Sequence, residues 1–286
     1  MTAAETRPAP STVEMSTTTA AGGGVAGPAG VGELTASALL EALAAGTIRA
    51  AEPDDAAVDG WRVRSDVKAA ILACFSDRTM TSHHVGPFAF HDRAALPPID
   101  PGPDRRIVPG GTAIRAGAYL APGVIVMPPS YVNVGAWVGP GTMVDSHVLV
   151  GSCAQIGAGV HLAAGVTIGG VLEPAGARPV IVEDDAFVGA GSRLLDGVLV
   201  RAGAVIAAGV VLTGTSRLID LVEEREIAGT VEQPLVVPPG SVVVPGTRHI
   251  AGEWAEARGL SIATALIVKR RDRGTDARVA LETALR

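Results

Sequence analysis

The sequence predicts a mainly β fold in which short strands stack as regular coils around a narrow interior. Aliphatic residues recur at every sixth position through the central part of the chain. The composition includes 36 glycines, while aromatic residues account for only 3%. A six-residue period matches neither the 3.6-residue period of a helix nor one long alternating strand. Short strands joined by tight turns satisfy all of these observations.

The repeat occupies two stretches separated by one break. Its aliphatic positions are first Ile114, Leu120, Val126, Val132, Val138, Val144, Val150, Ile156, Leu162 and Ile168. After a break over GGVLEPAGARPVI they are Val182, Val188, Leu194, Val200, Ile206, Leu212 and Leu218. A glycine commonly follows three places later, as at Gly117 and Gly135. Stacked coils would bury the aliphatic residues as one column, and glycine permits the corners.

This hexapeptide pattern resembles the left-handed parallel β-helix of the hexapeptide-repeat acyltransferases. The resemblance implies that three hexapeptides complete one triangular coil, so the repeat makes about six coils. We therefore expect a left-handed β-helix over residues 106–245.

Residues 31–105 are expected to form a small α-helical N-terminal domain and a linker. The first predicted helix has three leucines on one face: Leu39, Leu40 and Leu43. Gly46 is suited to end this helix, and Ser65 is suited to cap a second one. Prolines and acidic residues over 84–105 indicate the linker.

The two ends of the chain differ in character. Residues 1–30 are expected to be a flexible tail, because their Ala, Gly, Thr and Pro cannot offset the entropy of ordering. Residues 246–286 are expected to be a short C-terminal β/α extension, with SIATALIVKR as a strand and DARVALETALR as a short helix. VPPGSVVVPG precedes them as a further β segment.

Charge and composition narrow the functional class. A net charge of −6 and a pI near 5.5 argue against nucleic acid or an anionic membrane as the main partner. The N-terminus lacks the features of a signal peptide, and no run of about eighteen apolar residues predicts a membrane span. Cys74 and Cys153 fit neither a disulfide framework nor a CxxC zinc site, so we expect a cytoplasmic protein.

Specific strings then point to one family. MPPSYVNVGAWVGPGTMVDSHVLVGSCAQIGAGVHLAAGVTIGGVLEP resembles the core of the tetrahydrodipicolinate N-succinyltransferase family, succinyl-CoA-dependent enzymes of lysine and diaminopimelate biosynthesis. LLEALAAGTIRAAE, VPPGSVVVPG and ALIVKR extend the resemblance to residues 34–286. It implies a homotrimer with active sites in grooves between neighbouring β-helices. It also implies direct transfer of a succinyl group to the amino group of the ring-opened substrate.

The resemblance carries two substrate residues onto this chain. Arg106 matches the arginine that opens the β-helix, and a guanidinium suits a dicarboxylate because it binds carboxylates bidentately. Asp145 matches the aspartate of the family's MVD string and is the expected catalytic residue, which takes the ammonium proton or orients the nucleophile. Backbone N–H groups are expected to polarise the thioester carbonyl. Without the resemblance, Asp145 would be a turn residue and Arg106 a solvated charge.

The sequence departs from the family at three places. Arg193 stands where the family has a glutamate, and it can pair with an additional substrate carboxylate, while Asp196 can in part replace the acid. His147 stands where the family has a tryptophan-type residue, either contacting substrate or exposed at a turn. The family's Thr-Arg-Gly-Lys is Thr275-Asp276-Ala277-Arg278 here. These departures concern the acceptor more than the fold.

Coenzyme A is expected along the later coils, as a co-substrate and not a tightly bound cofactor. The expected contacts are Gly209, Thr213 and Arg217, with Lys269 or Arg270 near the phosphates. The alternative for KRRDR is a solvated basic turn. No metal site is expected, because only two histidines, His147 and His161, lie in the repeat; His161 is interpreted as a corner residue, and His83 and His84 as surface residues.

The stretch MVDSHVLVGSCAQIG also contains the elements of a Cys–His–Asp triad. Cys153 stands at the glycine position of its hexapeptide, which a small buried residue explains, and nothing nearby would activate a thiolate. Two other functions stay open beside the family reaction. One is a related acyltransferase of secondary metabolism (tabtoxin-type) that uses acetyl-CoA or another amino acid acceptor. The other is a non-catalytic trimeric β-helix scaffold.

Overall fold

The computed structural model describes residues 31–97, 99–272 and 274–276 of the chain. The predicted tail over 1–30 lies outside the described residues, and so does the predicted helix over 276–286 apart from Asp276. In the described part of the chain, no helix is both long enough and apolar enough to span a bilayer.

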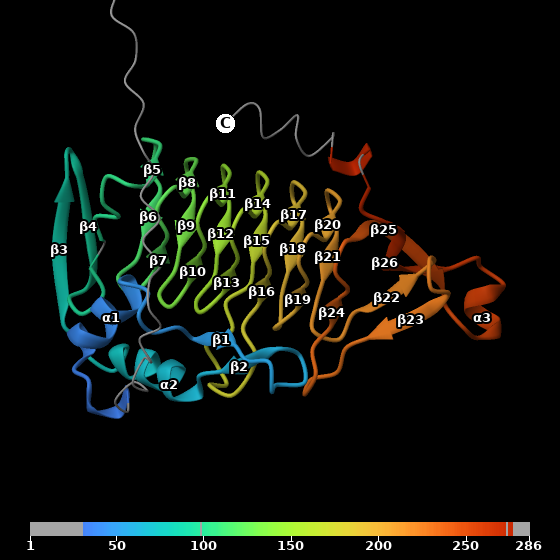
Figure 1. The fold of residues 1–286 in the computed structure, drawn as a ribbon, viewed down its shortest axis with the longest axis horizontal. Helices are drawn as coiled ribbons and strands as arrows, with labels where there is room; N and C mark the ends of the chain where they lie inside the picture. The colour runs from blue at the N-terminus through green and yellow to red at the C-terminus, as the bar shows by residue number, and fades with distance from the viewer. Residues whose placement is uncertain (1–30, 98, 273, 277–286) are drawn as a thin grey trace, which may run out of the picture. The chain divides into compact units, whose positions relative to one another are not determined.

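Three sheets, whose strands pair in parallel from coil to coil, wind into a β-helix (Figure 1). The covered sheet consists of β7 (Tyr119–Leu120), β10 (Trp137–Val138), β13 (Gln155–Ile156), β16 (Ile181–Val182), β19 (Leu199–Val200) and β24 (Val236–Val237). The exposed sheet consists of β6 (Ala113–Ile114), β9 (Tyr131–Val132), β12 (Leu149–Val150), β15 (Thr167–Ile168), β18 (Arg193–Leu194) and β21 (Val211–Leu212). The long sheet begins with β5 (Arg106–Ile107), β8 (Ile125–Val126), β11 (Met143–Val144), β14 (His161–Leu162), β17 (Phe187–Val188), β20 (Val205–Ile206) and β25 (Ser241–His249).

Each coil takes 18 residues, as the pairing of Trp137 with Gln155 and of Met143 with His161 demonstrates. The covered and exposed sheets have six strands each, which confirms the predicted six coils. The second residue of every two-residue strand points inward, and all seventeen predicted aliphatic positions are buried in one core. The repeat therefore fixes which side chains form the interior.

Two insertions interrupt the coils. The first spans residues 169–180 between β15 and β16, where the sequence pattern breaks. The second, between β21 and β24, contains the hairpin β22 (Arg217–Asp220) and β23 (Arg225–Ala228). Leu218, the last position of the predicted repeat, is buried in this hairpin and not in a coil, because β22 pairs with the C-terminal strand β26 (Ser261–Arg270). We refer to residues 213–235 as the hairpin insertion.

The N-terminal region mixes helices with β-hairpins. It contains η1 (Val31–Glu33), α1 (Ala36–Ala44), β1 (Ala51–Pro53), β2 (Trp61–Val63), α2 (Ser65–Cys74), β3 (Met80–Val85) and β4 (Phe88–Arg93). As predicted, Leu39, Leu40 and Leu43 are buried and Gly46, at φ 74°, follows the first helix. The prediction of Ser65 as a cap was wrong: Ser65 is the first helical residue, and the preceding Arg64 makes no capping bond. The predicted linker over 84–105 contains β4, because Phe88–Arg93 pairs with Met80–Val85.

The N-terminal region packs on one corner and one sheet of the β-helix. Helices α1 and α2 place Leu40, Leu43 and Ile71 against Val134 and Cys153, at the corner between the exposed and covered sheets. The β1–β2 hairpin covers Ile181 and Leu199 with Ala51 and Trp61. This leaves the exposed sheet and the corner between the long and exposed sheets for other contacts.

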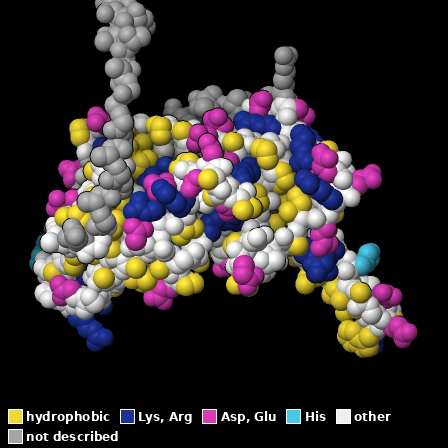
Figure 2. Space-filling view, turned by 60° about the horizontal axis from the view of Figure 1, so that its bottom comes forward, with side chains coloured by type: hydrophobic (Ala, Val, Ile, Leu, Met, Phe, Trp, Pro, Cys, Tyr) yellow, Lys and Arg dark blue, Asp and Glu magenta, His cyan; other side chains and the backbone are white. Residues whose placement is uncertain are grey.

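The C-terminal extension forms an antiparallel arm. β25 runs on past its coil and pairs with β26, with α3 (Glu253–Glu256) between them. The strand predicted over SIATALIVKR is β26. Apolar side chains gather at the end of the arm (Figure 2), where Trp254 and Ile262 are 66% and 45% exposed.

The corners of the coils depend on glycines at which no side chain fits. A Cβ on Gly139 would lie 2.6 Å from the carbonyl oxygen of Gly157, one coil away. A Cβ on Gly176, in the first insertion, would meet no atom within 4 Å. The first contact is with backbone, so a Gly139 side chain must push two coils apart.

We expect Gly139→Ala to lower the free energy of unfolding by about 1–3 kcal/mol, since overpacking costs this much. Gly176→Ala should change it by less than about 0.5 kcal/mol. Thermal and urea denaturation of the two variants measure the difference. Equal stability of both variants would contradict the corner packing described here.

Candidate active site

Several predicted site residues lie along one edge of the β-helix, the corner between the long and exposed sheets. Asp145, Ser146 and His147 form this corner in the third coil, and Gly209 forms it in the sixth. Backbone bonds stack the corners: Gly165 N donates to Ser146 O (2.8 Å), and Gly209 N donates to Ala190 O (2.9 Å). With a strand spacing of 4.7–4.9 Å, His147 and Gly209 are about 14 Å apart along the axis. We call this line of corners the site edge.

Asp145 is held in place by backbone contacts. Its amide donates to Leu162 O (2.9 Å), and its own carbonyl accepts from Ser130 Oγ (2.8 Å). Among the described residues, the half-buried carboxylate accepts one bond, from Ser146 N at 2.6 Å, through Oδ1. A carboxylate has room for several more donors. This side chain is therefore fixed in direction and able to bind an amine.

His147 occupies a backbone position that other coils give to glycine. Its φ is 62°, and the matching residues of the next coils, Gly165, Gly191 and Gly209, have φ of 71°, 69° and 73°. A side chain in this left-handed region is strained by about 1 kcal/mol or more. The imidazole is exposed, two residues from Asp145. Cys153, Asp185 and Asp196 have the same left-handed backbone, so the φ angle by itself assigns no role to His147.

The two predicted arginines lie on different sheets, four coils apart. Arg193 is the exposed first residue of β18, on the exposed sheet between Thr167 and Val211, immediately after the site edge. Arg106 is exposed at the first coil of the long sheet, two coils before Met143. Asp196 lies away from the site edge, because it follows β18 at the opposite edge of the exposed sheet.

A pocket of about 400 Å³ opens at the end of the site edge. The predicted coenzyme A contacts Gly209 and Arg217 both line it, together with Val211, Thr215, Ser216, Arg248 and Thr264. Thr213 does not line it; this hydroxyl bonds to Ser216 Oγ at 2.9 Å. Arg248 is a cation that the sequence analysis missed, because only the folded arm brings β25 into the sheet that contains β22, with β26 between them.

The basic residues predicted near the phosphates are engaged elsewhere. Lys269 Nζ pairs with Asp272 at 2.8 Å. Arg270 donates to Asp220 (2.8 Å) and to Ser241 Oγ (2.7 Å), and Asp220 is fully buried. Although burial opposes it, bonds from Arg270 and from the amides of Glu223 and Val222 lower the pKa of Asp220. In this structure Arg270 therefore stabilises the arm, and Lys269 lies four residues beyond the pocket-lining Ala265.

The apparent Cys–His–Asp triad does not assemble. Cys153 lies at the corner under α2, one sheet away from Asp145, and its φ of 65° places it where other coils have glycine. Burial raises the pKa of the Cys153 thiol to about 12, against the charge of Lys68. His161 is buried on the long sheet, edge-on to Phe187 at 5.0 Å. In the part of the chain that is described, no three His, Cys, Asp or Glu side chains are grouped to hold a metal ion.

Comparison with known proteins decides the family. A family model for the hexapeptide repeat of succinyl-transferase matches residues 179–214. A Rhodospirillum rubrum protein is 41% identical over 257 residues, covering 87% of this chain and 87% of its own. A Granulibacter bethesdensis protein is 42% identical over 256 residues, covering 86% and 87%. Both are named 2,3,4,5-tetrahydropyridine-2,6-dicarboxylate N-succinyltransferase.

The chain belongs to this family. The predicted family is thereby confirmed, and with it the left-handed β-helix and the class of enzyme, an acyltransferase. Among solved structures, a Campylobacter jejuni protein provisionally described as a 2,3,4,5-tetrahydropyridine-2-carboxylate N-succinyltransferase aligns with 81% of this chain and 62% of its own, at a TM-score of 0.44 and 18% identity. The acetyltransferase domain of PglB from Neisseria gonorrhoeae, in complex with acetyl coenzyme A, aligns at a TM-score of 0.30 and 19% identity over 50% of this chain and 52% of its own.

We expect Cys153 to be inert in the folded enzyme. With a pKa of about 12, about one thiol in 10⁴ is ionised at pH 8, so alkylation should be at least about 10³-fold slower than in the unfolded chain. Iodoacetamide labelling, followed by mass spectrometry of the Cys153 peptide with and without urea, measures both rates. Fast labelling of the folded enzyme with loss of activity would restore the cysteine as a nucleophile.

We expect His147→Gly to be more stable than His147→Ala by about 0.5–1 kcal/mol, because glycine accepts the left-handed backbone without strain. Both variants remove the exposed imidazole, so the pair isolates the backbone contribution. Cys153→Gly is the matched control, since it relieves the same strain but loses buried contacts and should be destabilised. Urea denaturation of the three variants gives the comparison, and an alanine variant as stable as the glycine variant would refute the strain.

Proposed function

We propose that this enzyme transfers the succinyl group of succinyl-CoA to the amino group of ring-opened tetrahydrodipicolinate, in the route to diaminopimelate and lysine. One observation carries the proposal. Relatives that bear the name of this activity are 41% identical over 86–87% of the chain. The position of Asp145 on the site edge that leads to the pocket supports it. The cytoplasm, where succinyl-CoA is available, is the proposed compartment.

The proposed reaction is direct transfer within a ternary complex. Once the ammonium has given one proton to Asp145, the amine nitrogen attacks the thioester carbonyl and the new C–N bond forms. The C–S bond then breaks, and the proton that the nitrogen loses as it becomes an amide passes to the thiolate, so coenzyme A leaves as the thiol. The ammonium proton of the acceptor passes to the Asp145 carboxylate, whose second oxygen has capacity for it. A positioned base of this kind contributes about 10²–10⁴-fold.

The pocket is the proposed site of the phosphate-bearing end of coenzyme A. Arg217 and Arg248 line it, and a guanidinium binds phosphate well. Arg217 is half-exposed and pairs with Glu226 at 3.1 Å, so it remains accessible to a phosphate. The pocket is about 14 Å from His147 along the axis, a distance that the flexible pantetheine arm can bridge. Lys269, engaged with Asp272, would have to change partners to take part.

Backbone amides of the site edge are the proposed donors to the thioester carbonyl. The glycine amides of each corner donate to the preceding coil, as Gly191 N does to Ala164 O (2.9 Å). Among the described residues, the amides of Ala164, Ala190 and Ala208 carry no such bond. These three alanines are exposed at the tips of their corners. An amide there can meet a developing oxyanion without breaking the stack of coils.

The acceptor is proposed to bind between Asp145 and the arginines. Arg106, two coils before Asp145, offers a guanidinium for one carboxylate of the substrate, and His147 offers an additional polar contact. Arg193 lies four coils from Arg106, about 19 Å along the axis, so one subunit does not offer both guanidinium groups to the same small substrate, and the second would come from the neighbouring subunit. The exposed sheet also presents Leu149 and Val211, which are 36% and 50% exposed. We propose that a neighbouring β-helix of a homotrimer covers this face and closes the groove. The trimer would thus complete the acceptor site.

We expect Asp145→Asn to lower kcat with succinyl-CoA and tetrahydrodipicolinate by about 10²–10⁴-fold, with little change in the KM for succinyl-CoA. Asp196→Asn is the matched control, because this carboxylate lies two coils further on, at the opposite edge of the exposed sheet, and the variant should retain activity. Steady-state kinetics with succinyl-CoA and acetyl-CoA, and with tetrahydrodipicolinate and 2-aminopimelate, provide the measurement. No transfer from succinyl-CoA to either acceptor would overturn the proposed function.

A further inference from the structure

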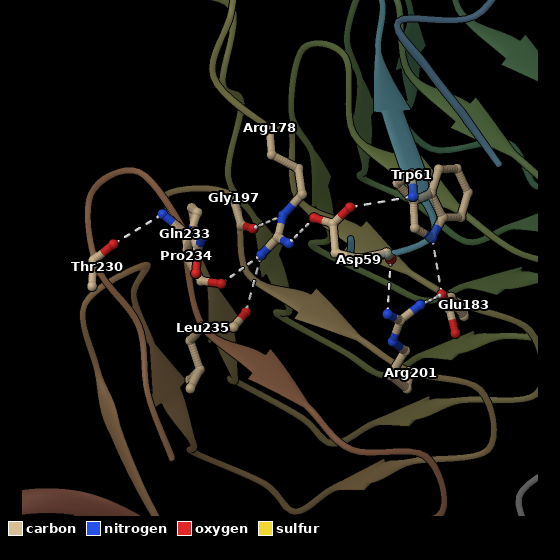
Figure 3. Close-up of polar contacts among 10 residues, drawn as sticks. All are labelled: Asp59, Trp61, Arg178, Glu183, Gly197, Arg201, Thr230, Gln233, Pro234 and Leu235. Carbon is tan, nitrogen blue, oxygen red and sulfur yellow. Dashed lines mark hydrogen bonds and ion pairs between the residues drawn. The ribbon is translucent and has the colours of Figure 1, made fainter. Parts of the chain in front are cut away.

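Arg178 joins three segments that are far apart in the sequence (Figure 3). Its Nη1 donates to the carboxylate of Asp59, in the turn between β1 and β2. Its Nε donates to Gly197 O (2.8 Å), at a corner of the fifth coil. Its Nη2 donates to Pro234 O (2.7 Å), at the end of the hairpin insertion. The side chain is only 6% exposed, so these partners replace its water.

The contact at Pro234 lies at the neck where the hairpin insertion leaves and re-enters the β-helix. Leu235 N donates to Gly214 O (2.8 Å), which closes the neck, and Leu235 O also accepts from Arg178 Nη2 (3.3 Å). A Cβ on Gly214 would lie 3.3 Å from the side chain of Pro234. The two segments of the neck, at Gly214 and at Pro234–Leu235, are therefore in direct contact. Arg178 holds the second segment against the fifth coil.

The segment of the neck that contains Gly214 continues directly into the wall of the pocket. Gly214 is followed by Thr215, Ser216 and Arg217, which all line it. Ser216 O accepts from Gly229 N (3.4 Å), and Arg217 O accepts from Thr264 Oγ1 (2.9 Å). These bonds tie the segment with Ser216 and Arg217 to the rest of the hairpin insertion and to the arm. Whatever fixes Pro234 and Leu235 thereby fixes the wall of the pocket.

A second arginine provides a contrast. Arg201 also holds the β1–β2 turn, donating to Asp59 O (2.8 Å) and to Glu183 Oε1 (2.7 Å), where Trp61 Nε1 bonds as well (2.9 Å). Its side chain is 26% exposed, and its bonds go to the turn and the β-helix, away from the hairpin insertion. Arg178 and Arg201 thus share the N-terminal attachment, but Arg178 alone of the two extends it to the pocket.

We propose that Arg178 is a positioning residue for acyl-CoA binding, which sets the pocket wall through the neck of the hairpin insertion. The inference rests on the proposed function for the identity of the pocket's ligand. Arg178 touches neither substrate nor the reacting atoms. Replacing Arg178 leaves the carbonyl groups of Gly197 and Pro234 without their donor. The neck and β22, which begins at Arg217, then lose their fixed position.

The test compares Arg178→Gln with Arg201→Gln in calorimetric titrations with coenzyme A and in steady-state kinetics. We expect Arg178→Gln to raise the Kd for coenzyme A and the KM for succinyl-CoA about tenfold, with kcat and the KM for the acceptor within about twofold. Arg201→Gln should leave both coenzyme A constants unchanged. Asp59→Asn, which keeps all the carbonyl bonds of Arg178, should also leave them unchanged.

The outcomes separate the inference from the proposed function. Wild-type enzyme that binds no coenzyme A would refute the proposed ligand of the pocket. Wild-type enzyme that binds it, with Arg178→Gln binding equally well or Arg201→Gln equally impaired, would refute the positioning role. If Arg178→Gln does not fold, Arg178→Lys is measured instead. Its point charge keeps the pairing with Asp59 but cannot reach the three carbonyls together, so the same rise in Kd is expected.

Discussion

Each coil of the β-helix must return the chain to the same inward position after 18 residues, and the rest of the structure depends on this constraint. Aliphatic residues then stack on their equivalents in neighbouring coils and form one core, as Val144 does on Leu162. The corners have no freedom to adjust: the coils are so close that Gly139 cannot accept a Cβ. Buried hydroxyls serve the same geometry. Thr142 Oγ1 donates to Gly157 O (2.7 Å) and accepts from Val160 N (3.1 Å), so it bonds across coils without an unpaired polar group.

The stacked corners of the β-helix are rigid, so they can hold the candidate site in place on an exposed surface. Asp145, His147 and Gly209 are placed by stacked backbone bonds, and their spacing is a multiple of the strand separation. The proposed chemistry at Asp145 and the proposed binding of coenzyme A three coils further on can therefore keep a fixed distance without a cleft inside the molecule. The strained backbone of His147 is tolerated because the coils on both sides determine its conformation, through the bond from His147 N to Pro129 O (2.7 Å).

The two insertions and the N-terminal region add what the repeat cannot supply. Lys68 of α2 is fully buried, and its Nζ donates to the carbonyls of Ala177 (2.6 Å) and Pro174 (3.3 Å), so the first insertion is tied to the helices. Burial lowers the pKa of Lys68, which reflects the cost of holding a charge there. Arg178, one residue further along, ties the same insertion to the β1–β2 turn and to the neck of the hairpin insertion. Interruptions of the repeat are thus the points at which distant parts of the chain are joined.

The sequence by itself determined the β-helix, its six coils, their inward residues and the break at the first insertion, because a six-residue period translates directly into burial when coils stack. The family strings determined Asp145 and Arg106 as candidates, and the structure places Asp145 on the edge that carries Gly209. Only the tertiary structure decided which polar residues meet. Arg248 joins Arg217 because the arm folds back beside the hairpin insertion, and Arg270 is taken up by Asp220 for the same reason. The arm and the insertions lie outside the period, so no local pattern encodes their pairing. The partners of Arg178 are Asp59, Gly197 and Pro234, which are 119, 19 and 56 residues away in the sequence and meet it only after folding. A charged side chain in a loop predicts exposure to solvent until the segments that bury it are in place.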